Sequence, residues 1–421
     1  MFTRQPQRSF SEAIDNKKGD VCMVTMQTFD VALKDIYEEP TKDQINIGSG
    51  IFLSKVEQTS RDIEGGRRVY KIAPYGVNGG TGSGSDTQAL PVAGGNNYVP
   101  FISGIKSIRG VIRFTDQVMK ASRSNRAAFE SAMQSEQDGL LKSVKHTYGR
   151  QVYLDGTGIC ATCDVNVATT TLLVDTTQYL VEGMTIDIVD ATTGAAVANG
   201  TQRRIAAVVR TGPVRSITLV GAAAVTTAAT DVIVEQGSWN QELTGMEAVY
   251  AQAGNLYGLN KALYPWLVPY QNNLGGNIDD QAIVDTINFV EEYRGSNINL
   301  ITVNPAVESE YYKYLEATKR SVNTETLEGG YKTLKVCGRT MSKDRFIRPG
   351  TMKLNDTTQW KMHTMDGGDW SWLDEDGKIL KWVSGFAMWE AAMIKYCELI
   401  CDHPGGQAEI TNITTTSNLF N

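Results

Sequence analysis

The stretch IRGVIRFTDQVMKASRSNRAAFESAMQSEQDGLLKSVKHTYGRQVYLDGTG, from Ile108 to Gly158, contains a change of hydrophobic period that decides the fold. Its first residues, up to Phe114, are rich in β-branched and aromatic side chains and predict a strand. From Thr115 or Asp116, either of which can cap a helix, apolar residues recur on one helical face. These are Phe129, Met133, Leu140, Val144, Tyr148 and Val152. The pattern predicts one helix of about 35 residues, on the order of 50 Å long, which is typical of a flat or elongated domain.

The residues before this helix predict a long β-hairpin with an irregular tip. Its arms are RRVYKIAPY (67–75) and YVPFISGIKSIRGVIRF (98–114). The residues between them, 76–97, are rich in glycine, serine and asparagine and predict no regular structure. Within them, NGGTGSGSDT (78–87) resembles a phosphate-binding loop, but no lysine and no helix follow its glycines. We therefore interpret it as the flexible tip of the hairpin.

The residues after the helix predict an inserted β module and then a mixed α/β region, so the fold class is α+β. The module is predicted at 161–238 from five short β-like runs separated by Gly, Asp and Thr turns. The runs are TTLLVD, GMTIDIVDA, RRIAAVVRT, RSITLVGA and DVIVEQ. Beyond Trp239 the patterns predict a helix at 279–295, a buried strand at 297–305 and a second helix at 306–320.

Composition limits the function classes. The 421-residue chain has a net charge of −7, which argues against a dedicated nucleic-acid binder. The first residues form no secretory signal, and no run of about 18 apolar residues is present. We therefore expect synthesis in a cytoplasm, reduced thiols and no contact with a membrane.

Few residues suggest chemistry. Cys160 and Cys163 have the C-x-x-C spacing of metal and redox sites, but a structural zinc needs four ligands, so ordinary thiols are the favoured interpretation. DEDG (374–377) lacks the spacing of a calcium loop and predicts a hairpin turn. Lys142, Lys145 and Arg150 near the end of the long helix predict a solvated basic face, with a role in lining DNA as the alternative. No cofactor site and no catalytic residue are predicted.

The order of these elements resembles the major capsid protein of tailed bacteriophages, which has the HK97-like fold. Three segments carry the resemblance: the stretch quoted first, GGYKTLKVCGRTMSKDRFIRPGTMKLNDTTQW (329–360), and WSWLDEDGKILKWVSGFAMWEAAMIKYCELICDHPGGQAEI (370–410). The resemblance implies the following units: an N-terminal arm (1–50), an extended hairpin or E-loop (51–112), a peripheral-domain spine helix (113–160), the inserted β domain (161–238), an axial domain (239–378), and peripheral closing strands with the C-terminus (379–421).

The same resemblance implies a structural protein of the virion and not an enzyme. Such a chain self-assembles into hexamers and pentamers of an icosahedral head around double-stranded DNA, which it contacts weakly and without sequence specificity. Implied partners are a portal, a separate scaffolding protein and a decoration protein. The E-loop tip would contact a neighbouring subunit through Asn78, Gly79, Gly80, Gly82 and Gly84. Two alternatives are an encapsulin-like compartment shell and a surface or carbohydrate-binding protein built on the β module.

Overall fold

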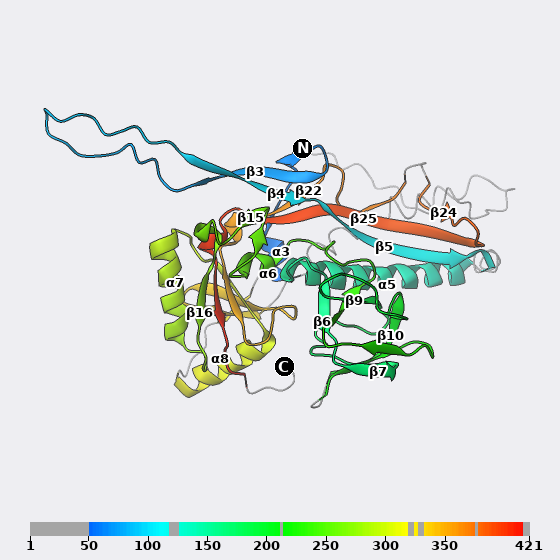
Figure 1. Cartoon of the computed structure of the whole chain (residues 1–421). Coiled ribbons are helices and arrows are strands. Elements are labelled where there is room, and N and C mark those ends of the chain that lie inside the picture. Colours follow the sequence, from blue (N-terminus) through cyan, green and yellow to red (C-terminus); the bar gives the residue numbers. More distant parts are fainter. Residues whose placement is uncertain are drawn as a thin grey trace, which may run out of the picture.

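The computed structural model describes residues 50–117, 126–210, 214–318, 324–326, 332–374 and 378–415. The predicted N-terminal arm, apart from Gly50, and most of the predicted DEDG turn lie outside these residues. The described chain is α+β, as predicted. One long helix lies below a sheet that contains a long strand, and a hairpin projects far to one side (Figure 1). Of two further β-rich units, one lies below the helix and the other lies to its left in this view.

The hairpin consists of β3 (Arg68–Tyr75) and β4 (Asn97–Gly104), paired along their whole length from Arg68 opposite Gly104 to Tyr75 opposite Asn97. The short β2 (Ile63–Glu64) pairs with the start of β3. No strand forms in 76–96, as predicted. The predicted second arm, however, is divided. Its second half is a separate strand, β5 (Lys106–Thr115), which pairs with β25 and not with β3. Ile105 ends the hairpin by donating its N–H to the Arg67 carbonyl.

The long helix is α5 (Arg126–Tyr153), 28 residues or about 42 Å long. Residues 118–125, which include part of its predicted first turns, lie outside the described chain. The predicted stripe is buried at Val144, Tyr148 and Val152. The helix approaches β5 so closely that a Cβ added at Gly110 would lie 2.8 Å from Val144 Cγ2. A larger residue at this crossing would force the Val144 and Leu140 side chains to move.

The sheet above α5 is built around β25 (Met388–Cys401), and we call it the long-strand sheet. On one side β25 pairs with β5 over ten residues. On its other side β25 pairs with β22 (Trp360–Thr364), β23 (Ser371–Trp372) and β24 (Lys381–Trp382). β1 (Glu57–Thr59), which follows α3 (Ile51–Lys55), is parallel to β22. Trp360 and Trp370 are fully buried in this core, whereas Trp382 is half exposed.

The β module is present, and each of the five predicted runs contains a strand. These strands are β8 (Thr171–Leu173), β9 (Thr185–Asp190), β10 (Arg203–Val209), β11 (Ser216–Leu219) and β13 (Asp231–Glu235). With β6 (Ile159–Thr162) they form a six-stranded sheet in the order β6-β13-β9-β10-β11-β8. A smaller sheet pairs β7 (Asn166–Thr169) with β12 (Val225–Thr227).

The remaining unit is a seven-stranded sheet with two helices. Its strand order is β16-β26-β21-β17-β20-β19-β18. The strands are β16 (Tyr270–Asn273), β17 (Leu300–Val303), β18 (Thr324–Thr326), β19 (Lys332–Val336), β20 (Arg339–Lys343), β21 (Met352–Asn355) and β26 (Ala408–Thr411). The helices are α7 (Asp280–Arg294), capped by the Asp279 side chain, and α8 (Pro305–Thr318). The predicted helices and buried strand are therefore confirmed.

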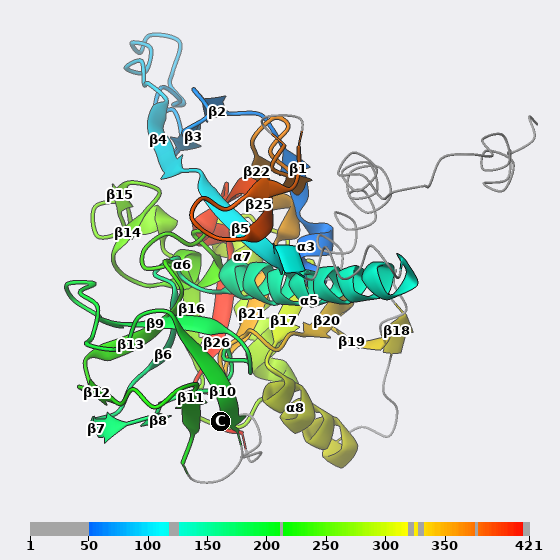
Figure 2. The same cartoon turned by 90° about the vertical axis from the view of Figure 1, so that its right-hand side faces the viewer.

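Short elements connect these units. They are α6 (Met246–Tyr250), β14 (Asn255–Leu256), β15 (Leu259–Asn260) and the 3-10 turns Pro265–Leu267, Thr357–Gln359 and Pro404–Gly406. The predicted boundary between the axial domain and the closing strands is residue 378. β22 and β23 precede this residue but belong to the long-strand sheet, whereas β26 follows it but belongs to the seven-stranded sheet. The chain thus crosses between the two sheets more often than the predicted boundary implies. In both views α5 lies between the long-strand sheet and the β module (Figure 2).

Candidate functional site

The tip of the hairpin is narrow and carries exposed apolar side chains. Asn78 Oδ1 accepts a hydrogen bond from the Gly80 N–H at 2.9 Å. A Cβ added at Gly94 would lie 2.6 Å from the nitrogens of Gly79 and Gly80, so the two sides of the loop touch there. Three apolar residues of the loop are almost completely exposed: Val77 (86%) before this contact, and Leu90 (91%) and Val92 (88%) beyond it. The glycines predict a flexible loop, whereas these exposed apolar residues are the part of the loop that a partner can bury.

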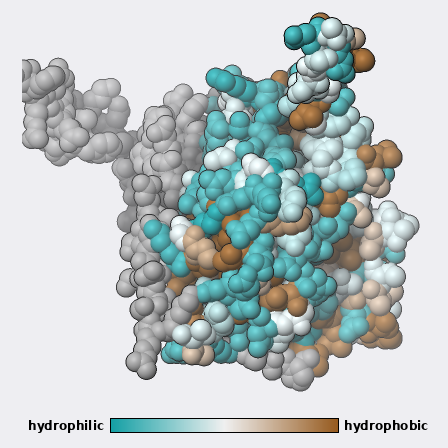
Figure 3. All heavy atoms as spheres, turned by 90° about the vertical axis from the view of Figure 1, so that its left-hand side faces the viewer, coloured by the Kyte–Doolittle hydropathy of each residue, from teal (hydrophilic) through white to brown (hydrophobic). Residues whose placement is uncertain are grey.

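One face of the hairpin is apolar and largely exposed, most of all toward the tip. The strand register places Tyr70 opposite Ile102, Ile72 opposite Pro100, and Pro74 opposite Tyr98. Residues directly opposite each other share one face of a sheet. Tyr98 is 60% exposed and Ile72 57% exposed. Figure 3 shows brown, hydrophobic atoms on the projecting arm at its upper right. Contiguous exposed apolar surface of this kind marks an interaction site.

The opposite face of the hairpin packs on the chain's own body. Phe101 and Tyr75 both stack on Trp266, with ring centroids 6.0 and 5.5 Å apart. Phe101 also contacts Tyr257, whose backbone carbonyl accepts the Ile102 N–H at 3.0 Å. The hairpin is therefore held at its root by one face, while much of its other face and its tip are exposed.

Polar contacts complete this root. Lys71 Nζ on β3 binds Asp402 Oδ1 at 2.6 Å, just after the end of β25. Ser103 Oγ on β4 donates to Glu398 Oε1 at 3.1 Å within β25. The Tyr257 hydroxyl donates to the Leu399 carbonyl and accepts from the Cys401 N–H. The hairpin thus depends on β25 for its attachment, although the two segments are about 300 residues apart.

The predicted basic face is only partly present. Lys142 is exposed and Lys145 is half-buried, but Arg150 is fully buried. The Arg150 guanidinium binds Glu242 Oε2 at 3.0 Å and Glu235 Oε2 at 2.9 Å. The prediction that Arg150 lies on a solvated or DNA-facing surface is therefore wrong. The end of the β module covers this part of α5, and Arg150 ties the helix to it.

The two candidate metal ligands are core thiols. Cys160 and Cys163 are almost completely buried, and burial is the main cause that raises the pKa of each thiol to about 12. Metal binding and redox chemistry both need the thiolate form. In the part of the chain that the structure describes, no group of three or more His, Cys, Asp or Glu side chains is arranged to hold a metal ion.

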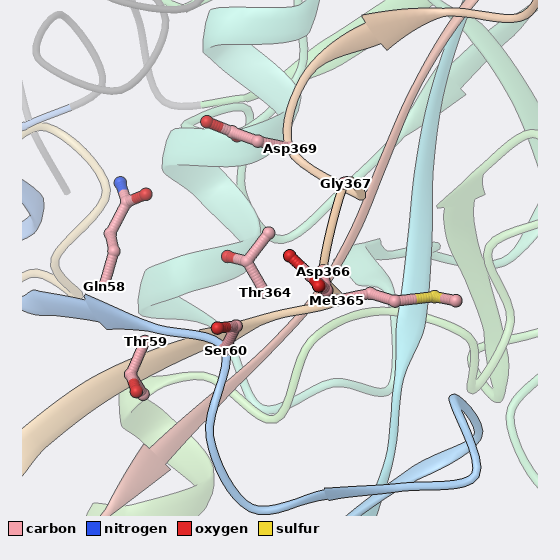
Figure 4. Close-up of a pocket in the computed structure, with 8 residues that line it drawn as sticks. All are labelled: Gln58, Thr59, Ser60, Thr364, Met365, Asp366, Gly367 and Asp369. Atoms are coloured by element: carbon pink, nitrogen blue, oxygen red, sulfur yellow. The ribbon is translucent and has the colours of Figure 1, made fainter.

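A small open cavity of about 250 Å³ lies between β1 and the turn that follows β22 (Figure 4). Its lining consists of Gln58, Thr59, Ser60, Thr364, Met365, Asp366, Gly367 and Asp369. The Asp369 carboxylate is engaged by Lys395 Nζ at 2.9 Å. The lining residues include hydroxyls and carboxylates but no histidine, cysteine or lysine, and they form no pair of nucleophile and base. None of the helices in the described residues has the length and apolar character needed to cross a bilayer.

The exposed apolar hairpin is therefore the strongest candidate for an interaction surface in the described residues. No protein-family model and no curated protein matches the chain. Among solved structures, a chain of the cyanophage A-1(L) capsid asymmetric unit is similar at a TM-score of 0.51 and 10% identity, over 86% of this chain and 91% of that one.

Two further structures are similar at lower scores. The SrpI encapsulin complex of Synechococcus elongatus gives a TM-score of 0.43 at 9% identity, over 86% of each chain. The procapsid of satellite phage P4 gives 0.42 at 8% identity, over 94% of this chain and 97% of that one. At these identities the likeness concerns the fold alone.

Proposed function

We propose that this chain, which has the HK97-like fold of phage capsid proteins, is the major capsid protein of a tailed bacteriophage. It would form the hexamers and pentamers of an icosahedral head around double-stranded DNA. One observation supports this most: the fold spans 91% of the cyanophage capsid chain and includes a projecting hairpin whose apolar face and tip have no cover. The role is structural and not catalytic, and the protein is part of the virion after synthesis in the host cytoplasm.

The hairpin acts as the arm between subunits. Its tip, which contains Asn78, Gly79, Gly80, Gly82 and Gly84, lies on a neighbouring copy. The flanking Val77 and the tip residues Leu90 and Val92 become buried there. Fully burying one Val or Leu side chain stabilises a contact by about 1.5–3 kcal/mol, so three contribute roughly 5–9 kcal/mol before the cost of ordering the loop. The glycines Gly79, Gly80, Gly82 and Gly84 let this loop adapt to the different neighbours found in hexamers and pentamers.

The other units take the roles that the fold implies. The long-strand sheet and α5 form the peripheral domain, and the seven-stranded sheet forms the axial domain near the capsomer centre. Lys142 and Lys145, in the second half of α5, are the candidates for a weak contact with DNA, which fits a chain of net charge −7. A portal, a separate scaffolding protein and a decoration protein are the expected partners, and the β module is an insertion in the common fold.

Expression of the full chain, alone and with its own phage's scaffolding protein, tests this function. Electron microscopy is expected to show closed shells, capsomers or tubes. A chain that stays monomeric under every condition contradicts the proposal and favours the alternative of a surface or carbohydrate-binding protein. An encapsulin-like compartment would also assemble, but its particles would carry a protein cargo and no packaged genome.

A further inference from the structure

The buried carboxylate of Glu398 connects the long-strand sheet, the hairpin and the segment before α6 through hydrogen bonds. Glu398 lies in β25 and has no exposed surface. Its Oε1 accepts hydrogen bonds from Ser103 Oγ in β4 and from the backbone N–H of Thr244, each at 3.1 Å. Ser103 belongs to the hairpin, and Thr244 to the segment that leads from the β module into α6. Movement of the hairpin root away from the body therefore breaks a bond to Glu398 and opens its site to water.

The second oxygen of this carboxylate lacks a hydrogen-bond donor. Glu398 Oε2 is buried and has no hydrogen-bond partner. Directly opposite on β22, and therefore on the same face of the sheet, lies His363. The His363 ring is also buried, with Nδ1 3.0 Å from the Arg61 carbonyl and with Nε2 lacking a partner. A carboxylate buried with one oxygen unsatisfied is unfavourable when it is ionised and less so when it is protonated.

Neighbouring charges do not offset this burial. Burial raises the pKa of Glu398 to about 7, against the opposing effects of the Thr244 and Ser103 hydrogen bonds and of Lys106 on β5. Burial is also the main cause that lowers the pKa of His363 on β22, so His363 is neutral at neutral pH. Lys71 on β3 is paired with Asp402 at 2.6 Å. Lys361 on β22 lies between the carboxylates of Asp402 and Glu57, at 3.7 and 3.8 Å.

We propose that Glu398 is a proton-operated latch on the hairpin, which holds the root closed while its carboxyl is protonated and releases the root as it ionises. This inference rests on the proposed function, in which the hairpin is the arm that contacts a neighbouring subunit. Opening removes the Ser103 hydroxyl and admits water, so the ionised form is stabilised in the open state only. A shell that forms in mildly acidic solution would keep its hairpins fixed to their own subunits, and a rise in pH would free them.

The direction follows from linkage. The pKa of the Glu398 carboxyl is about 7 in the closed state and 4.5 when the group is exposed to water. The closed state is therefore most favoured below pH 4.5, where the carboxyl is protonated in both states, and loses this advantage as the pH rises from 4.5 to about 7. The ratio of open to closed root therefore increases over this window. The increase is at most roughly 300-fold, if opening exposes the carboxyl completely.

Hydrogen–deuterium exchange of the purified full chain between pH 5.5 and 8.5 tests the latch, with the assembly state checked by sedimentation at each pH. The reporter is the β4 peptide that contains the Ile102 amide, which donates to the Tyr257 carbonyl at 3.0 Å. A peptide from α7 serves as the internal reference for the intrinsic pH dependence of exchange. The exchange rate of β4 relative to α7 is expected to rise about tenfold or more across this range in the wild type and to stay flat in Glu398→Gln.

The control is His363→Gln, which removes the opposite titratable group and is expected to keep the pH dependence. Should Glu398→Gln fail to fold, Ser103→Ala is expected to raise β4 exchange at the low end of the range, where the wild-type root is closed. A flat wild-type profile, or a Glu398→Gln profile that follows the wild type, overturns the latch. The readout needs no assembled shell, so a chain that shows the latch but never assembles would refute the proposed function alone.

Discussion

Serine substitution of Leu90 and Val92 separates the role of the hairpin tip in assembly from any role in folding. Both side chains are about nine-tenths exposed, so the isolated chain gains nothing from their burial. The free energy of unfolding should therefore change by no more than about 0.5 kcal/mol. In a shell the two side chains together stabilise each contact by roughly 3–6 kcal/mol. The chain concentration needed for assembly should then rise by roughly 10²–10⁴, since each 1.4 kcal/mol is about tenfold.

The assay has two parts. Chemical denaturation followed by circular dichroism measures the stability of the unassembled chain, and sedimentation with electron microscopy measures the concentration at which particles form. The matched control is Val167→Ser in β7, because Val167 is 76% exposed but lies in the β module. The control is expected to leave the assembly concentration unchanged. The reasoning is refuted if the Leu90 and Val92 variant assembles at the wild-type concentration, or if its unassembled form loses several kcal/mol of stability.

Four further predictions concern the body of the protein. Arg150→Ala should lower the free energy of unfolding by about 3–5 kcal/mol, because it leaves the buried Glu242 carboxylate without its cation; a loss below 1 kcal/mol in a denaturant titration would contradict the buried ion pair. Gly110→Val should lower the free energy of unfolding by about 1–3 kcal/mol, because its side chain clashes with Val144. Gly139→Ala is the control: it lies in α5, a Cβ there meets nothing within 4 Å, and it should not destabilise the chain. Burial and nearby arginines lower the pKa of His146 from 6.5 to about 4. The free energy of unfolding should therefore keep its full value above pH 6.5 and fall by up to about 3 kcal/mol as the pH drops to 4, because the unfolded chain binds the proton first. His146→Gln should remove this part of the acid sensitivity in thermal melts between pH 7 and 4.5. A thiol reagent should modify the exposed Cys337 in the native chain and reach Cys160 and Cys163 only on unfolding, as peptide mass mapping would show; rapid native labelling of Cys160 would contradict the core assignment.

The sequence predicted elements whose signal is local. The stripe through Val144, Tyr148 and Val152 predicted the long helix because the period of an α-helix is visible in one segment. Turn residues and β-branched runs predicted the strands of the module in the same way. In both cases the residues that decide the structure lie next to each other in the chain.

Predictions failed where a distant segment decides the outcome. β5 continues the β-rich run of β4, and nothing within residues 98–114 shows that its partner is β25, some 280 residues away. Arg150 reads as one of several basic residues of a helix, and only the packing of Glu235 and Glu242 against it explains its burial. Leu90 and Val92 are present in the glycine-rich stretch of the sequence. Their exposure, however, follows from the projection of the hairpin, which the local sequence does not show.

Electron cryomicroscopy of assembled particles tests the central claim most directly, because it shows where each hairpin lies. We predict a closed shell in which residues 76–96 of every copy pack on a neighbouring copy, with Leu90 and Val92 buried in that contact. Particles in which these residues stay exposed to solvent or fold back on their own subunit would contradict it.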